Sequence, residues 1–226
     1  IDPHHVLTMQ TSLAGGRYAS TAKENEFTVE ALRRIENIPG VEAAATSIVL
    51  PTDSEVDLPF NIAGRPPKAG RTYNGDEQWR PVTPHYLSVF KIPLLRGRFV
   101  QETDTPASAK IVVINQVMAN KYWPKENPIG QVITIGKGLG PQFEDPPRQI
   151  VGVVANVRET GLRDVAREDH ETFLRRVGGE DLELRAVEAA HQGRSEVRLV
   201  VDQKHSRHYR SPSQCSEMRT PCARPS

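Results

Sequence analysis

The chain has 226 residues, of which 37% are hydrophobic and 6% aromatic, and its formal net charge at pH 7 is +1. This length suits one or two domains, and the apolar fraction is at the low end for a globular protein. The balanced charge argues against a nucleic-acid-binding protein, and no apolar run approaches the roughly 20 residues of a membrane-spanning helix.

The first fifty residues carry the pattern of a strand, a helix and a second strand. Residues 6–13 alternate as in a strand, and residues 41–50 are rich in Ala and Val. Between them Ser20 or Thr21 can cap a helix over residues 21–38, with a capping box completed by Glu24. We predict a β-α-β unit in which the two strands are neighbours. The helix should face them with an apolar stripe of Phe27, Ala31, Ile35 and Ile38.

Residues 51–90 are less regular. We predict an edge strand over residues 58–63, a further strand at residues 80–82 and a short helix over residues 84–90. Residues 64–71 read GRPPKAGR, and two adjacent prolines exclude regular structure there.

The segment from residue 110 to residue 157 predicts a compact strand-rich unit. Its three strands should cover residues 110–114, 131–135 and 149–157, because their runs are short and β-branched. Asn115 can cap a helix over residues 116–122, which Pro124 ends. We expect the strands to form one sheet covered by Val117, Met118 and Tyr122.

The composition changes near Leu162, beyond which the chain is more densely charged. Residues 164–176 and 181–190 have helical propensity, and residues 196–202 can form a strand. We interpret residues 163–226 as a tail, produced by a reading frame that is shifted or truncated after Leu162. A divergent helical extension is the alternative. Residues 203–226 should lack regular structure, and the domain should therefore expose an unpaired sheet edge. The start at Ile1, with no signal peptide, indicates a piece of a longer protein.

A glycine-rich loop at residues 136–140 holds Lys137 and superficially resembles a phosphate-binding loop. A P-loop has the pattern G-x-x-x-x-G-K-[ST], in which the two glycines are five residues apart, and it leads into a helix. Here Gly130 lies six residues before Gly136, which is one residue too many. Gly138 stands where the Ser or Thr is needed, and Pro141 lies where the helix should begin. We predict a β-hairpin loop and no nucleotide site.

The metal-binding candidates are weak. His205, His208, Cys215 and Cys222 have no spacing typical of a zinc site, although a disulfide between the cysteines is chemically possible. Asp53, Glu55 and Asp57 alternate and can weakly attract a cation, but a solvated loop is the commoner outcome. His4 and His5 should be solvated, and His85 should pack beside Tyr86.

Glu102 and Asp104 form an acidic turn, whose expected role is to contact backbone N–H groups. None of the common hydrolase or metalloprotease motifs occurs. We therefore predict no catalytic residue, no cofactor and no metal ligand.

Four segments, taken together and in order, resemble the periplasmic core domain of macrolide-exporter-type (MacB-like) ABC transporter permeases. They read IENIPGVEAAA (residues 35–45), LLRGR (94–98), VVINQVMANKYWPKENPIG (112–130) and IVGVVANVR (150–158). The resemblance covers residues 1–162 and implies an α+β, two-lobed domain with β-α-β units and an inserted strand-rich lobe, incomplete at its C-terminus.

The same resemblance implies a function. The chain would be an extracytoplasmic, periplasmic piece of an inner-membrane export permease, coupling ATP-driven helix motion to substrate efflux without chemistry of its own. The implied partners are an ABC ATP-binding subunit or domain, a second permease and a periplasmic adaptor. Nucleic acid is not among them. The alternative is a stand-alone soluble α+β binding module of the cell envelope.

Overall fold

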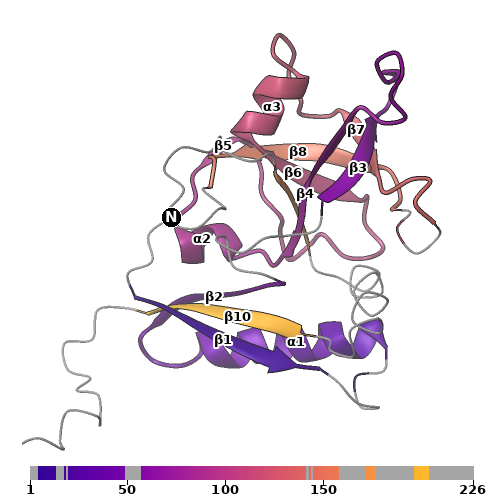
Figure 1. The fold of residues 1–226 in the computed structure, drawn as a ribbon. Coiled ribbons are helices and arrows are strands. Elements are labelled where there is room, and N and C mark those ends of the chain that lie inside the picture. The colour runs from indigo at the N-terminus through magenta and orange to yellow at the C-terminus, as the bar shows by residue number, and fades with distance from the viewer. Residues whose placement is uncertain are drawn as a thin grey trace, which may run out of the picture.

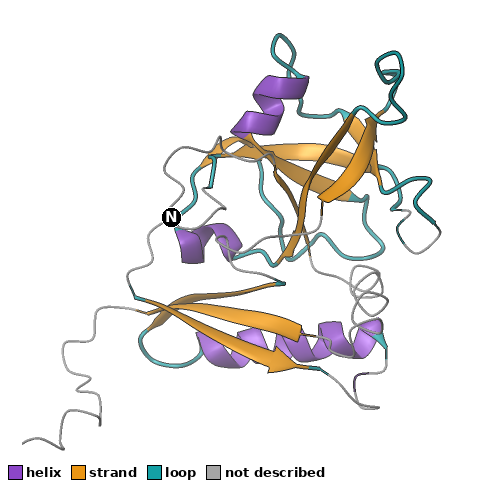
Figure 2. Cartoon of the chain, in the orientation of Figure 1, coloured by secondary structure: helices purple, strands orange, loops and turns teal. Residues whose placement is uncertain are grey.

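The structure is a computed structural model, and it describes residues 5–13, 18, 20–48, 57–140, 143, 145–157, 172–176 and 196–203. Two lobes are visible in Figure 1. In the first lobe, helix α1 covers one face of a small sheet made of β1, β10 and β2. The second lobe is strand-rich and carries α3 on its outer side, while α2 lies between the lobes. Figure 2 shows how strongly strands outnumber helices in the second lobe.

The helices are α1 (Thr21–Glu36), α2 (Tyr86–Phe90) and α3 (Gln116–Tyr122). The strands are β1 (Val6–Ser12), β2 (Val41–Ser47), β3 (Asp57–Ile62), β4 (Gly75–Val82), β5 (Leu94–Gly97), β6 (Ile111–Asn115), β7 (Val132–Ile135), β8 (Arg148–Val154), β9 (Thr172–Arg176) and β10 (Glu196–Gln203). The mixed α+β fold predicted from the sequence is confirmed.

The three strands of the first lobe run in the order β1, β10, β2, and both pairings are antiparallel. Val201 of β10 lies opposite Leu7 on one side and Ala44 on the other. The prediction that β1 and β2 are neighbours is therefore wrong. They flank one helix in the sequence, but the distant β10, with its buried Val200 and Val201, enters between them.

Helix α1 packs on this sheet with a face rotated from the predicted stripe. Its fully buried side chains are Glu24 and Thr28, whereas Phe27, Ala31 and Ile35 are half-buried. Ile38, predicted to face the sheet, is 54% exposed because the helix has already ended. Thr28 can be buried because its hydroxyl donates to the Glu24 carbonyl oxygen at 2.8 Å. Ser20 is the N-cap residue but makes no side-chain cap bond.

The second lobe closes on itself. Strand pairings run from β4 through β3, β7, β8, β6 and β9 back to β4, and β5 attaches to β8. β3 is thus flanked by β4 and β7, so its prediction as an edge strand is wrong: its alternating pattern did not reveal the second neighbour. The predicted sheet of β6, β7 and β8 is confirmed, and Met118 of α3 is buried against it. Asn115 caps α3 by accepting from the Met118 N–H at 2.9 Å.

Two strands come from beyond Leu162. A helix was predicted over residues 164–176. This prediction is wrong for residues 172–176, which form strand β9 and pair with β4 and β6. Packing between two strands overrides the weak helical propensity of this segment. The strand predicted at residues 196–202 is confirmed as β10. The predicted unpaired edge falls at β1, which pairs only with β10 within the described chain. Residues 204–226 lie outside the described residues, and Gln203 ends β10.

Candidate functional site

The junction between the two lobes is the site that the fold singles out. Helix α2 is inserted there, and four of its five side chains are buried. On one side it packs against small side chains of the first lobe, and on the other against strands of the second. The shared core contains Ala43, Ala45 and Val200 from the first lobe, and Val82, Ile111, Val113 and Val154 from the second. Alanines on β2 allow the helix to approach the sheet closely.

The backbone connection between the lobes is narrow. Strands β2 and β4 share a single register pair, Ser47 with Val82. Next to it the Thr83 N–H donates to the Thr46 carbonyl at 3.3 Å, and the Thr46 N–H donates to the Thr83 hydroxyl at 2.9 Å. Among the described residues few backbone hydrogen bonds cross the junction, and the buried side chains of α2 pack against both lobes.

Polar side chains reinforce the junction. Glu36 at the end of α1 accepts from the Ala44 N–H at 3.3 Å, and its Oε1 lies 2.5 Å from the His85 Nδ1 at the start of α2. Arg80, which is only 1% exposed, donates to the Tyr86 hydroxyl at 2.8 Å. The prediction that His85 packs beside Tyr86 is therefore wrong, since His85 is exposed and pairs across the lobes. A groove of about 260 Å³ runs beside this pair.

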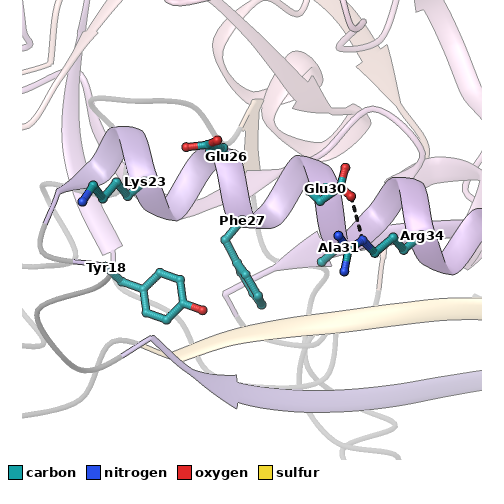
Figure 3. A pocket seen from close by; sticks show the side chains of 7 residues that line it. All are labelled: Tyr18, Lys23, Glu26, Phe27, Glu30, Ala31 and Arg34. Carbon is teal, nitrogen blue, oxygen red and sulfur yellow. Dashed lines mark hydrogen bonds and ion pairs between the residues drawn. The ribbon is translucent and has the colours of Figure 1, made fainter.

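A second groove, of about 500 Å³, follows the other flank of α1 (Figure 3). Tyr18 and Phe27 meet there edge to face, with ring centroids 5.2 Å apart. Glu30 accepts hydrogen bonds from Arg33 and Arg34, which lower the pKa of its carboxyl group to about 2. The groove is open and its charges are already matched along the helix, so it presents no reactive group.

The predicted loop around Lys137 joins β7 and β8, which pair as an antiparallel hairpin. Lys137 is exposed, and strand β8 follows where a P-loop needs a helix. Asp57 lies exposed at the start of β3. The other predicted metal-binding candidates fall outside the described residues: His4, Asp53, Glu55, His205, His208, Cys215 and Cys222. Among the described residues, no group of three or more potential metal ligands occurs.

The acidic turn has the expected backbone contact. The Asp104 carboxylate accepts from the Gln101 N–H at 2.9 Å. It also accepts two hydrogen bonds of 2.8 Å from the Arg98 guanidinium, which raises the pKa of Arg98. Arg98 was not singled out from the sequence. Its position in the LLRGR segment is the only signal that could have identified it. The Arg98–Asp104 ion pair holds the backbone in place directly after the end of β5.

A buried cluster on β4 was also missed. Glu77 is buried and accepts from Lys121 Nζ at 3.0 Å and from the Tyr122 hydroxyl. Burial and the neighbouring Glu77 raise the pKa of Tyr122, so the phenol stays protonated and donates. This cluster fastens α3 to the sheet. Nothing in the local pattern of the sequence distinguishes Glu77 from the solvent-facing acids around it.

No helix in the described part of the chain is both long enough and apolar enough to cross a membrane. The arrangement of described residues offers no nucleophile paired with a base. What the described residues show is two lobes, a single register pair between β2 and β4, and one helix packed between the lobes.

Comparisons with known proteins identify the family of this domain. The family described as the MacB-like periplasmic core domain matches residues 3–192. The macrolide export ATP-binding/permease protein MacB of Syntrophobacter fumaroxidans is 27% identical over 138 residues, which are 53% of this chain and 19% of that protein. The pyoverdine export ATP-binding/permease protein PvdT of Pseudomonas putida is 38% identical over 71 residues, which are 31% of this chain and 10% of that protein. The chain thus spans less than a fifth of either relative.

A solved structure shares the fold. The periplasmic region of MacB from Actinobacillus actinomycetemcomitans superimposes with a TM-score of 0.50 at 13% sequence identity. The superposition covers 89% of this chain and 75% of that one. At this identity the likeness concerns the fold alone.

Proposed function

The chain belongs to the family of MacB-like periplasmic core domains, and on that premise we propose that it is the extracytoplasmic domain of an ABC-type export permease. In this function the domain has no chemistry of its own. It receives the motion that ATP binding and hydrolysis produce elsewhere and passes it to a substrate outside the inner membrane.

One observation carries the proposal: α2 is buried between two lobes that share a single β2–β4 register pair. Packed interfaces change between discrete arrangements more readily than they deform continuously. A force applied to the first lobe would therefore rotate it against the second and separate Ser47 from Val82. That rotation is the means by which a membrane motion would reach the strand-rich lobe.

The first proposed partner, an ABC ATP-binding subunit or domain, is supported by the relatives, which are named as ATP-binding/permease proteins. We also propose a second permease copy and a periplasmic adaptor, which the family resemblance implies. The location would be the inner membrane, with this domain on its periplasmic side.

The test locks the junction. A permease carrying this domain would be prepared with Ser47→Cys and Val82→Cys, which are opposite each other in the β2–β4 pair. We expect the oxidised protein to lose export while ATP hydrolysis continues, and a reducing agent to restore export. The matched control is Asp57→Cys with Gln78→Cys, an opposed pair inside the second lobe. Export that persists with the junction locked, at the level of the control, would contradict the proposal.

A further inference from the structure

The connection between β3 and β4 is longer than the fold requires. β3 ends at Ile62 and β4 begins at Gly75, so 12 residues (63–74) join two antiparallel neighbours. Hairpins usually need about 2–5 residues for this purpose. Long loops in compact domains are commonly functional.

Hydrogen bonds within the loop hold it in one shape. Asn74 closes its base, because its Oδ1 accepts from the Ile62 N–H at 2.8 Å and its N–H donates to the Asn61 Oδ1 at 3.2 Å. At the tip, the Arg71 N–H donates to the Lys68 carbonyl at 3.0 Å, and Gly70 supplies the positive φ of 79° that this turn needs. The loop is therefore ordered before any partner arrives.

The charges of this loop are all of one sign. Residues 63–74 include Arg65, Lys68 and Arg71 but no Asp or Glu. Arg65 serves as an anchor, since it donates to the Tyr122 carbonyl at 2.5 Å and to Glu126 at 2.9 Å. Lys68 and Arg71 are exposed and form no ion pair with any described residue.

Two neighbouring loops add further cations. Lys125 directly precedes the Glu126 that binds Arg65, and it is exposed. Lys137 is exposed on the β7–β8 loop, where a Cβ on Gly138 would lie 3.3 Å from the Tyr73 hydroxyl. The loops thus abut, and four cations that form no ion pair with a described residue gather at one end of the second lobe. We call Lys68, Arg71, Lys125 and Lys137 the basic tip.

The position of the basic tip restricts its partner. In Figure 1 the β3–β4 loop lies at the upper right, whereas the start of β1 and the end of β10 lie together at the lower left. In the proposed function this domain is joined to the membrane part of a permease, and if that joint lies at these strand ends, the basic tip points away from the membrane. Anionic lipid of the inner membrane is then out of reach, while a protein of the envelope is not.

We propose that the basic tip is a docking surface for an acidic face of a protein partner. The step rests on the proposed function for the direction in which the tip points, and on the structure for its charge and order. Because the hydrogen bonds of the β3–β4 loop already hold its backbone, little loop freedom is lost on binding, and the cations steer an acidic surface by long-range attraction.

The experiment measures binding of a fluorescein-labelled poly-glutamate peptide to the full chain by anisotropy, at low and at high salt. Lys68→Glu with Arg71→Glu should weaken binding by about tenfold at low salt, because two attractive charges become repulsive. The matched control is Lys23→Glu with Arg96→Glu, which changes the net charge equally at exposed sites elsewhere. The control should change affinity by less than about threefold.

Three outcomes would overturn the proposal. The wild-type chain does not bind the peptide, both variants lose affinity equally, or anionic phosphatidylglycerol vesicles bind through Lys68 and Arg71 while the peptide does not. The last result would assign the tip to lipid. None of these outcomes changes the result expected from the Ser47–Val82 cross-link. Failure of the docking surface can therefore be distinguished from failure of the proposed function.

Discussion

Glu24 shows how burial and charge oppose each other within a single residue. Its side chain lies on the face of α1 that packs on the sheet and is only 5% exposed. Burial raises the pKa of its carboxyl group above the usual 4.5, because the ionised form loses water. The first turn of the helix offsets part of this cost, since its N-terminus favours negative charge.

The change Glu24→Gln should therefore stabilise the domain at pH 7 by less than about 1 kcal/mol. The folded-state pKa lies above the unfolded one, so the cost of Glu24 is full above the folded pKa. It fades as the pH falls through that pKa, and it is absent below the unfolded value. Urea unfolding of both proteins at several pH values measures this. The exposed Glu26→Gln is the control. A difference that grows on acidification would contradict the argument.

Gly75 occupies a position where the neighbouring side chains leave no room for a Cβ atom. A Cβ at this position would lie 2.5 Å from Phe60 Cε1 and closer still to the Tyr122 hydroxyl. Gly75→Ala should cost about 1–3 kcal/mol, measured by thermal or urea unfolding. The cost should shrink in a Tyr122→Phe background, which removes the nearest atom. Equal costs in both backgrounds would show that the clash is not the cause.

We predict that Lys137 does not bind a nucleotide. Its loop lacks the hydroxyl side chain and the helix that a P-loop needs, and it joins two strands of a hairpin. Titration of the chain with ATP and magnesium should give no saturable isotherm. An isotherm that Lys137→Ala abolishes would contradict the hairpin interpretation and reopen an enzymatic function.

Among the elements, those with a strong local signal were predicted closely. The β-branched run before Asn115, the capping Asn itself and the Pro124 stop all act within a few residues, so β6 and α3 are readable from the sequence. Helix α2 was also predicted, but its place between the lobes was not. That place depends on alanines of β2 and on Val200 of β10, which are far away in the chain.

The core strands of the second lobe allow a quantitative test. Val113 of β6 and Val153 of β8 are fully buried, on the two opposite faces of this part of the sheet. Replacing either with Ala should lower the free energy of unfolding by about 1–3 kcal/mol, through lost burial and a residual cavity. Val132→Ala, at a half-buried position of β7, should cost less. Losses within about 0.5 kcal/mol for Val113 and Val153 would contradict their place in the core.

At the scale of the whole molecule, the local pattern of the sequence could not supply the long-range pairings. The run around Val200 predicts a strand, yet it does not say that the strand enters between β1 and β2. Pairing between distant segments is decided by tertiary packing, which a window of residues does not contain. The same holds for the junction, whose members come from α2 and from the strands β2, β4, β6, β8 and β10. The family was recognisable because several motifs occur in one order, although each motif alone is modest.

The boundary predicted at Leu162 can be tested on the intact fold. β9 connects β4 with β6 and closes the second lobe, and β10 is the strand through which β1 joins β2. A chain ending at Leu162 would lose both, leave Ala43 to Ala45 without the strand partner that β10 gives them, and deprive β1 of the strand that holds it. We expect this truncated chain to show no cooperative thermal transition. A chain ending at Gln203 should instead unfold within about 3 °C of the full chain, because it keeps every described strand. Cooperative unfolding of the shorter chain near the Tm of the full one would mean that β9 and β10 are dispensable, and the division at Leu162 would then describe a real domain boundary.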